Sequence, residues 1–167
     1  MKLTKTLIAC LLLGSVAAYA ADGTSAVDGL NSCKNLRKQL KSREALSCFY
    51  KVYQKAPANS AERSEALVGM GWSFYRLDDF LKDEAIKPAY KACLGANPVP
   101  TGNAVASSIG MACVNQANNK NITPFWNSMR LVVEAFHQQN LGEKDEPILT
   151  LQKAINLDPK NEVAHYV

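Results

Sequence analysis

The chain has 167 residues, of which 47% are hydrophobic and 20% are charged, and its formal net charge is +4. This composition is typical of a single globular domain and excludes an intrinsically disordered chain, which would have fewer apolar residues. The charge is also too small for a protein whose main partner is a nucleic acid, because binding to phosphate groups requires a dense basic surface.

Residues 1–20 have the pattern of a cleavable signal peptide. A positive start is followed by an apolar run at 7–13 and by small residues that end at Ala20, as signal peptidase requires. The run is shorter than the roughly 20 residues that a membrane span needs. The sequence therefore predicts cleavage after Ala20, one mature domain at 21–167 without a membrane span, and a periplasmic or secreted location.

One alternative concerns the same segment. Residues 7–10 resemble a lipobox, the motif that directs lipidation of a cysteine, here Cys10. Because Cys10 comes early and the apolar run continues past it, we favour an ordinary signal peptide. Its removal takes away two lysines and no acid, which leaves 17 Lys and Arg against 15 Asp and Glu.

After a short lead-in at 21–26, apolar residues recur at helical spacing and no alternating strand pattern competes with them. The start signals are Ser42 and Ser60 as candidate caps and Thr123 followed by Pro124. The sequence predicts an all-α fold with helices at 30–40, 42–56, 60–77, 89–94, 104–117, 123–140 and 147–157, and the beginning of another at 161–167.

The expected mature domain contains four cysteines, Cys33, Cys48, Cys93 and Cys113. An even number in an exported chain indicates two disulfides, for which three pairings exist. We favour Cys33–Cys48 and Cys93–Cys113, because intervals of 15 and 20 residues suit the two legs of an antiparallel helix pair. No C-x-x-C motif occurs, so the sequence predicts no zinc or redox centre, no cofactor and no catalytic residue.

A spacing of a bulky residue, a small residue three positions later and a proline five positions after that occurs three times. In physical terms, one helical turn separates two packing residues and proline then stops the helix. Repetition of such a unit is typical of helical-repeat proteins. The copies are Phe49, Val52, Pro57; Tyr90, Cys93, Pro98; and Leu151, Ala154, Pro159.

These copies resemble the tetratricopeptide repeat (TPR) family, whose unit is two antiparallel helices in about 34 residues. Residues 149–161 are similar to the second helix of a unit, and Leu67-x₂-Met70-Gly71-x₂-Phe74 is similar to a first helix. The resemblance implies a stack of antiparallel helix pairs, a fragment of a right-handed α-solenoid. The chain departs from the family because its prolines lie 41 and 61 residues apart.

The longer interval leads us to expect an inserted helix at 104–117, which a Cys93–Cys113 disulfide would pin to the stack. Positions 86 and 147 also lack the small residue that the family has there. The stretch 162–167 is either a short capping helix or the start of a further repeat.

The resemblance implies a concave face, built from the first helix of each pair, that binds another protein or a peptide. Aromatic and arginine side chains are common anchors of such surfaces. Alternatively, Trp72 and Tyr75 pack against the next helix, and the basic cluster at 34–43 is a solvated helix face. The candidate partner-binding residues are Asn31, Lys34, Arg37, Trp72, Tyr75 and Arg76.

The sequence therefore predicts a non-catalytic interaction or assembly scaffold. A secreted inhibitor or immunity-type protein is the alternative, and a small extracytoplasmic hydrolase is a third possibility. Such a hydrolase would need paired carboxylates or a metal cluster. Its candidates are an acidic group on an expected loop and a pair three residues apart on one helix: Asp78, Asp79, Asp83 and Glu84, and Glu134 with His137.

Overall fold

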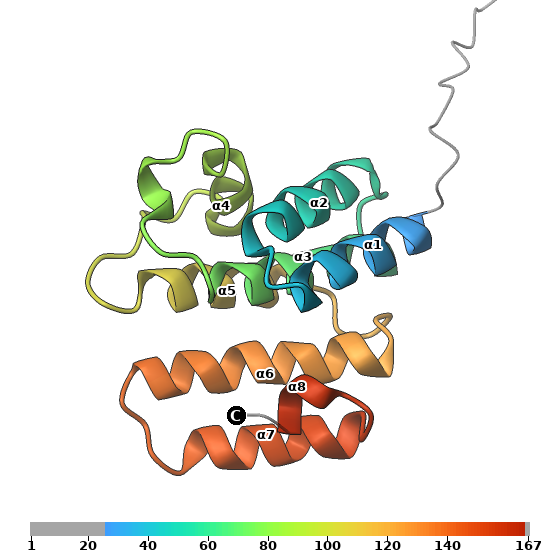
Figure 1. The fold of residues 1–167 in the computed structure, drawn as a ribbon, viewed down its shortest axis with the longest axis vertical. Coiled ribbons are helices and arrows are strands. Elements are labelled where there is room, and N and C mark those ends of the chain that lie inside the picture. The colour runs from blue at the N-terminus through green and yellow to red at the C-terminus, as the bar shows by residue number, and fades with distance from the viewer. Residues whose placement is uncertain (1–25, 166–167) are drawn as a thin grey trace, which may run out of the picture.

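The structure is a computed structural model and describes residues 26–165. The expected signal peptide, the lipobox alternative at Cys10 and residues 21–25 of the expected lead-in lie outside the described residues, whereas Ala26, the last residue of that lead-in, begins the first helix. Within 26–165 the chain forms eight α-helices, a short 3-10 helix and no β-strand (Figure 1). The all-α prediction is therefore confirmed for this part of the chain.

The helices follow the predicted order, and most bounds agree within a few residues. The first helix differs most, because it begins at Ala26 and not at Leu30 and ends at Lys38 and not at Leu40. The third helix ends at Phe74 and not at Leu77. The elements are α1 (Ala26–Lys38), α2 (Ser42–Lys55), α3 (Ala61–Phe74), η1 (Phe80–Lys82), α4 (Lys87–Leu94), α5 (Val105–Gln116), α6 (Pro124–Asn140), α7 (Glu146–Leu157) and α8 (Glu162–His165).

Of the three predicted caps, only Ser60 accepts a hydrogen bond through its side chain. The Ser60 hydroxyl accepts a hydrogen bond from the Arg63 amide at 3.1 Å, as predicted for an N-cap. Ser42 is the first residue of α2 and not its cap. Thr123 holds the N-cap position of α6 without a side-chain bond, and its amide donates to the buried Glu65 carboxylate at 2.8 Å. This bond ties the start of α6 to α3.

Helix α3 is the centre of the molecule, and every residue from Ser64 to Phe74 is buried. It packs against α2 and α1 on one side and against α5 and α6 on the other. The helices α1 and α2 form one antiparallel hairpin and α6 and α7 form another (Figure 1). The short α8 contacts both α6 and α7.

The structure corrects the expectation of an inserted helix at 104–117. Residues 104–117 were expected to be an insertion, but α5 packs along α3 and against α6, within the main series of helices. The marginal helix is α4, which packs on α5 and makes only a small contact with α2. The second copy of the repeated spacing, Tyr90, Cys93 and Pro98, belongs to this marginal region.

Both predicted disulfides are present. Cys33 and Cys48 join α1 to α2 with a Cα–Cα distance of 5.3 Å. Cys93 and Cys113 join α4 to α5 with a Cα–Cα distance of 4.3 Å. The second bond therefore joins the short α4 to α5, and the expectation that it pins an inserted helix at 104–117 is wrong.

Leu40 is in an unfavourable backbone conformation at the end of α1. Its φ is +61° and its side chain is 73% exposed, while the Lys41 amide closes the helix end by donating to the Leu36 carbonyl at 3.0 Å. Glycine favours this left-handed position, whereas a residue with a Cβ costs roughly 1–2 kcal/mol there. The predicted apolar stripe through Leu40 is therefore wrong at its last residue.

We expect Leu40→Gly to raise the free energy of unfolding by about 0.5–1 kcal/mol, because relief of strain exceeds the added entropy of the unfolded chain. Urea unfolding of the purified protein measures this change. Asn59→Gly is the matched control: φ is +64° at Asn59, and asparagine tolerates this region, so the gain there is expected to be smaller. A loss of stability in Leu40→Gly would contradict the prediction.

Candidate functional site

Arg37 and Trp72, two of the predicted partner-binding residues, lie in the interior, with exposed fractions of 4% and 3%. The Arg37 guanidinium lies 4.7 Å from the centre of the Trp72 ring, and its Nε and Nη2 donate to the Trp72 carbonyl at 3.4 and 3.3 Å. That carbonyl belongs to the last turn of α3, where helical partners are lacking. The expectation that these two side chains point off the core is therefore corrected.

The other two candidates on α1 lie near the surface. Asn31 is exposed, and Lys34 is half-buried with its Nζ 4.2 Å from the centre of the Phe125 ring. This contact joins α1 to the first turn of α6. Both side chains are available to a partner, and neither lines the cavity at the end of α3 that is described next.

Tyr75 and Arg76, at the end of α3, border a cavity of about 530 Å³. The Tyr75 ring is stacked on Phe136 of α6, with ring centres 4.1 Å apart and an interplanar angle of 9°. Arg76 is exposed, and its guanidinium lies 5.8 Å from the centre of the Tyr75 ring. We call this cavity the Tyr75 pocket; its lining residues are Tyr75, Arg76, Leu77, Asp78, Asn103, Ala106, Ser107 and Asn140.

The pocket is assembled from the ends of three helices that are distant in sequence. Tyr75 and Arg76 come from the end of α3, Asn103 and Ser107 from the start of α5, and Asn140 from the end of α6. The sequence identified Tyr75 and Arg76 because they are an aromatic and an arginine on the expected first helix of a repeat pair. Nothing in the local pattern marked the other three, since only the packing of α3, α5 and α6 brings them together.

Arg76 and the start of α5 place positive charge at the pocket. The N-terminus of α5 has no side-chain cap, so the first-turn amides add a partial positive charge. Burial and, to a smaller extent, the nearby Arg76 lower the pKa of Arg37 to about 10, which leaves Arg37 charged at neutral pH. Within residues 26–165 neither arginine has an acid within ion-pair distance. Asp78 supplies a negative charge elsewhere in the lining.

Ser107 and His137 form a hydrogen-bonded pair at the edge of the pocket. The Ser107 Oγ lies 3.1 Å from His137 Nδ1 and donates to the Ala104 carbonyl at 3.1 Å. Because the hydroxyl has only one proton, His137 Nδ1 donates to Ser107 Oγ in this arrangement. Ser107 is 3% exposed. The pair therefore joins α5 to α6 and leaves the hydroxyl poorly placed to attack a substrate.

The His137 imidazole gives the fold a pH dependence. Burial lowers the pKa of His137 below its ordinary value near 6.5, and Glu143 opposes this only in part. The folded state thus favours the neutral ring, so this contribution to stability is fully present above pH 6.5 and falls as the pH decreases from 6.5 to the lowered folded pKa.

We expect the melting temperature of the wild type to fall over this pH range and that of His137→Gln to fall less, as measured by thermal unfolding. An equal pH dependence of both proteins would contradict it.

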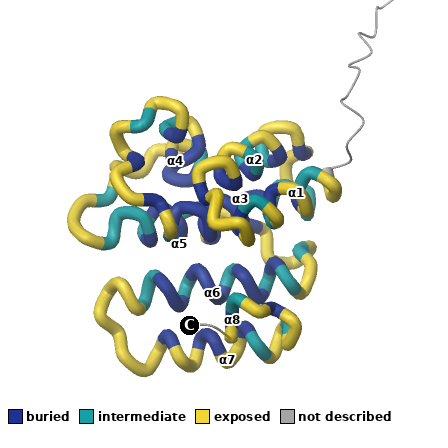
Figure 2. The backbone as a smooth tube through the Cα atoms, viewed as in Figure 1, coloured by how far each residue is buried: buried dark blue, intermediate teal, exposed yellow. Residues whose placement is uncertain are grey.

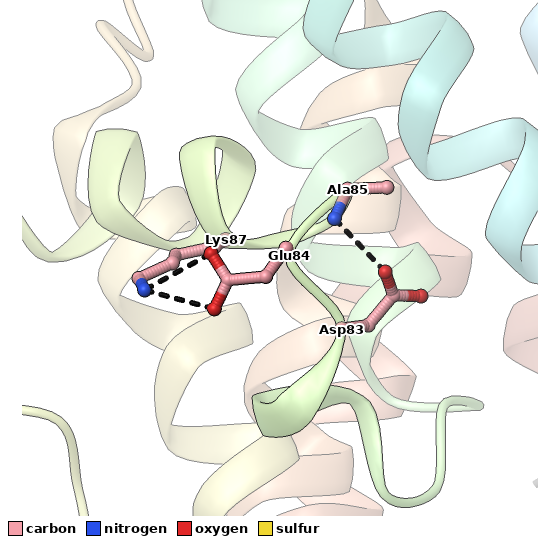
Figure 3. Close-up of polar contacts among 4 residues, drawn as sticks. All are labelled: Asp83, Glu84, Ala85 and Lys87. Carbon is pink, nitrogen blue, oxygen red and sulfur yellow. Dashed lines mark hydrogen bonds and ion pairs between the residues drawn. The ribbon is translucent and has the colours of Figure 1, made fainter.

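Two of the four acids named as hydrolase candidates, Asp83 and Glu84, have different partners. Asp83 Oδ1 accepts from the Ala85 amide at 2.9 Å, and Asp83 also forms an ion pair with Arg43 of α2. The Glu84 carboxylate instead accepts from Lys87 Nζ at 3.0 and 3.1 Å. The two carboxylates point away from each other (Figure 3). In this structure both carboxylates therefore stabilise the turn before α4.

In the second hydrolase candidate, Glu134 and His137 likewise bind different partners and not each other. The Glu134 carboxylate accepts from Arg130 Nη1 at 3.4 Å, while His137 contacts Ser107. Among the described residues no group of three or more His, Cys, Asp or Glu side chains is placed to hold a metal ion.

No family model, no curated protein and no solved structure matches this chain. Between residues 26 and 165 no helix is both long enough and apolar enough to cross a membrane. The two disulfides are compatible with an extracellular location, where such bonds persist.

Proposed function

We propose that this is an exported, non-catalytic protein with a TPR-like helical stack that binds a segment of another protein and so acts as an interaction or assembly scaffold. The TPR resemblance is supported by the pairwise packing of α1 with α2 and of α6 with α7, with α3 and α5 packed together between these pairs although η1 and α4 separate them in sequence. Export is supported by the signal-like residues 1–20 and by the two disulfides.

The Tyr75 pocket is the observation that carries the binding proposal. Its volume of about 530 Å³ is within the range of small-ligand sites, so it suits a few residues of an extended chain. Tyr75 is fixed by its stacking on Phe136, which lowers the entropy that an anchoring aromatic loses on binding. The amides of Asn103 and Asn140 each offer a donor and an acceptor, which match the two polar groups of a peptide bond.

The charges around the pocket indicate the preferred segment. Arg76 and the uncapped start of α5 favour an acidic side chain or a terminal carboxylate. Among the described residues Arg76 has no acid within ion-pair distance, so its guanidinium is free to pair with an acidic group of the bound segment. We therefore expect bound peptides to be acidic and their affinity to fall as salt increases.

A selection of random peptides displayed on phage against the purified protein tests this proposal. We expect enriched acidic peptides that bind the wild type and bind Arg76→Ala about tenfold more weakly, equivalent to a loss of about 1.4 kcal/mol. Lys51→Ala, which removes an exposed charge from α2, is the matched control and should bind normally. Peptides that bind the wild type, Tyr75→Ala and Arg76→Ala equally well would contradict a site at this pocket.

A secreted inhibitor or immunity-type protein is the alternative, and it would use the same surface on one target enzyme. The Ser107–His137 pair is the one observation that favours a hydrolase. Its support is weaker, because the hydroxyl is buried and its proton has a carbonyl acceptor. Release of p-nitrophenol from an ester by the wild type, lost in Ser107→Ala, would favour hydrolysis over binding.

A further inference from the structure

A second cavity, of about 180 Å³, lies at the other end of α3 from the Tyr75 pocket. It is formed where the end of α2, the start of α3 and the end of α5 meet. The helix α3 is buried along most of its length (Figure 2), so Ser64 and Leu67 make a buried floor. We call this cavity the Arg63 pocket; its polar rim consists of Asn59, Arg63, Gln116 and Asn118.

Arg63 is held in place by the end of α2. Its guanidinium lies 3.9 Å from the centre of the Tyr53 ring, and its Nη1 donates to the Tyr53 and Ala56 carbonyls at 3.1 and 3.3 Å. The donors on Nε and Nη2 have no acceptor among the described residues, and no acid there lies within ion-pair distance. A fixed guanidinium with unused donors matches a carboxylate, which it can bind through two parallel hydrogen bonds.

The amide side chains of the rim add a donor and an acceptor. Asn118 Oδ1 accepts from the Lys120 amide at 3.2 Å, so the Asn118 Nδ2 remains available as a donor. Gln116 Nε2 donates to the Ala92 carbonyl at 3.1 Å and to the Cys93 carbonyl, so the Gln116 Oε1 remains available as an acceptor. These groups suit a ligand that has a negative charge and both accepts and donates hydrogen bonds, as a carboxylate with neighbouring hydroxyl groups does.

The charge and the volume of the Arg63 pocket narrow the choice of ligand. No acid is among the described residues that line the pocket, so the ammonium group of an amino acid would meet Arg63 without a partner of opposite charge. The volume of about 180 Å³ holds about six water molecules at roughly 30 Å³ each. This is the size of one monosaccharide unit, and it is too small for a peptide of several residues.

We propose that the Arg63 pocket binds an acidic monosaccharide unit of the hexuronic acid type. The sugar carboxylate pairs with Arg63, and the sugar hydroxyl groups donate to Gln116 Oε1 and accept from Asn118 Nδ2. The free acid and one unit of an anionic polysaccharide share this chemistry. The site is separate from the Tyr75 pocket, so the binding goes beyond the proposed recognition of a peptide and can fail without affecting it.

Titration of the isotope-labelled protein with sodium galacturonate, followed by proton–nitrogen correlation NMR, tests this site. We expect signals of Arg63, Gln116 and Asn118 to shift with a dissociation constant of about 1 mM, which is typical of a ligand of this size. Galactose, which lacks the carboxylate, should bind at least about tenfold more weakly. A linear trimer of galacturonate separates the two sources: it should bind if the pocket accepts a unit of a chain, and not if it accepts the free acid alone.

Two neighbouring asparagines provide a matched pair of variants. Asn118→Ala should weaken galacturonate binding about fivefold, whereas Asn119→Ala, which changes an exposed residue outside the lining, should bind like the wild type. Arg63→Gln should abolish binding, and because Arg63 also holds the end of α2, circular dichroism must show that this variant is folded.

Three results would overturn the proposal. The first is the absence of any shift at galacturonate concentrations up to about 20 mM, well above the expected dissociation constant. The second is equal binding of galactose and galacturonate, since the carboxylate would then have no part in recognition. The third is unchanged binding in both Asn118→Ala and a folded Arg63→Gln, since another surface would then bind the sugar.

Discussion

Replacing Gly71 with alanine is expected to lower the free energy of unfolding by about 2 kcal/mol. A Cβ at this position would lie 2.7 Å from the carbonyl oxygen of Gly110, where α3 and α5 are in close contact. A backbone atom cannot move aside alone, so the two helices must separate, which costs about 3 kcal/mol. The higher helix propensity of alanine raises the free energy of unfolding by about 1 kcal/mol and so offsets part of this cost.

Gly71 and Gly110 approach each other closely from both sides, so each can be tested by a substitution of its own. A Cβ at Gly110 would lie 2.9 Å from the Gly71 carbonyl oxygen, so Gly110→Ala should be destabilising as well. The double variant should lose less than the sum of the two, because helices already separated accept the second methyl more easily. Urea unfolding followed by circular dichroism measures all three, with exposed Ser47→Ala as the neutral control. An unchanged or increased stability of Gly71→Ala would contradict the close packing.

Removing the Cys93–Cys113 disulfide by the double change to alanine is expected to cost roughly 3 kcal/mol of stability. The expectation follows from the chain entropy released by opening a 20-residue loop. It also follows from the position of α4, which has eight residues and packs mainly on α5. A helix of this length is unstable by itself, so α4 depends on its attachment.

Hydrogen exchange shows which helix is destabilised when the Cys93–Cys113 disulfide is removed. In the double variant the amides of α4 (Lys87–Leu94) should lose protection, while those of α6 (Pro124–Asn140) should keep it. The matched control removes Cys33 and Cys48, which join two helices with a broad mutual contact, and should leave α4 protected. Protection of α4 that persists without its disulfide would show that packing alone holds this helix.

The local features of this fold could be predicted from sequence, because they depend on neighbouring residues. The apolar periodicity located the helices, Ser60 was recognised as a cap, and the intervals between cysteines gave the correct pairs. The end of α1 was misplaced because the periodicity continues to Leu40, although the backbone turns there into a left-handed conformation.

Features that depend on packing between distant helices could not be predicted. The sequence spacing made 104–117 look like the insertion, but the contact of Gly71 with Gly110 brings α5 against α3 and leaves α4 at the margin. For the same reason Arg37 was expected at the surface and the position of Trp72 was left open between the surface and packing against a helix, whereas both side chains are buried.

The candidate site was anticipated only in part. Tyr75 and Arg76 were identified by residue type, since aromatic and arginine side chains commonly anchor interfaces. The remaining polar lining, Asn103, Ser107 and Asn140, comes from the ends of α5 and α6. No pattern in the sequence relates those ends to each other or to the end of α3.

Peptide mapping under non-reducing conditions, applied to the protein purified from its producing cells, tests most directly whether it is an exported helical stack held by two disulfides. The expected result is an N-terminus at Ala21, crosslinked peptides that contain Cys33 with Cys48 and Cys93 with Cys113, and no free thiol before reduction. Retention of residues 1–20 with reduced cysteines, or a crosslink between Cys48 and Cys93, would contradict this conclusion.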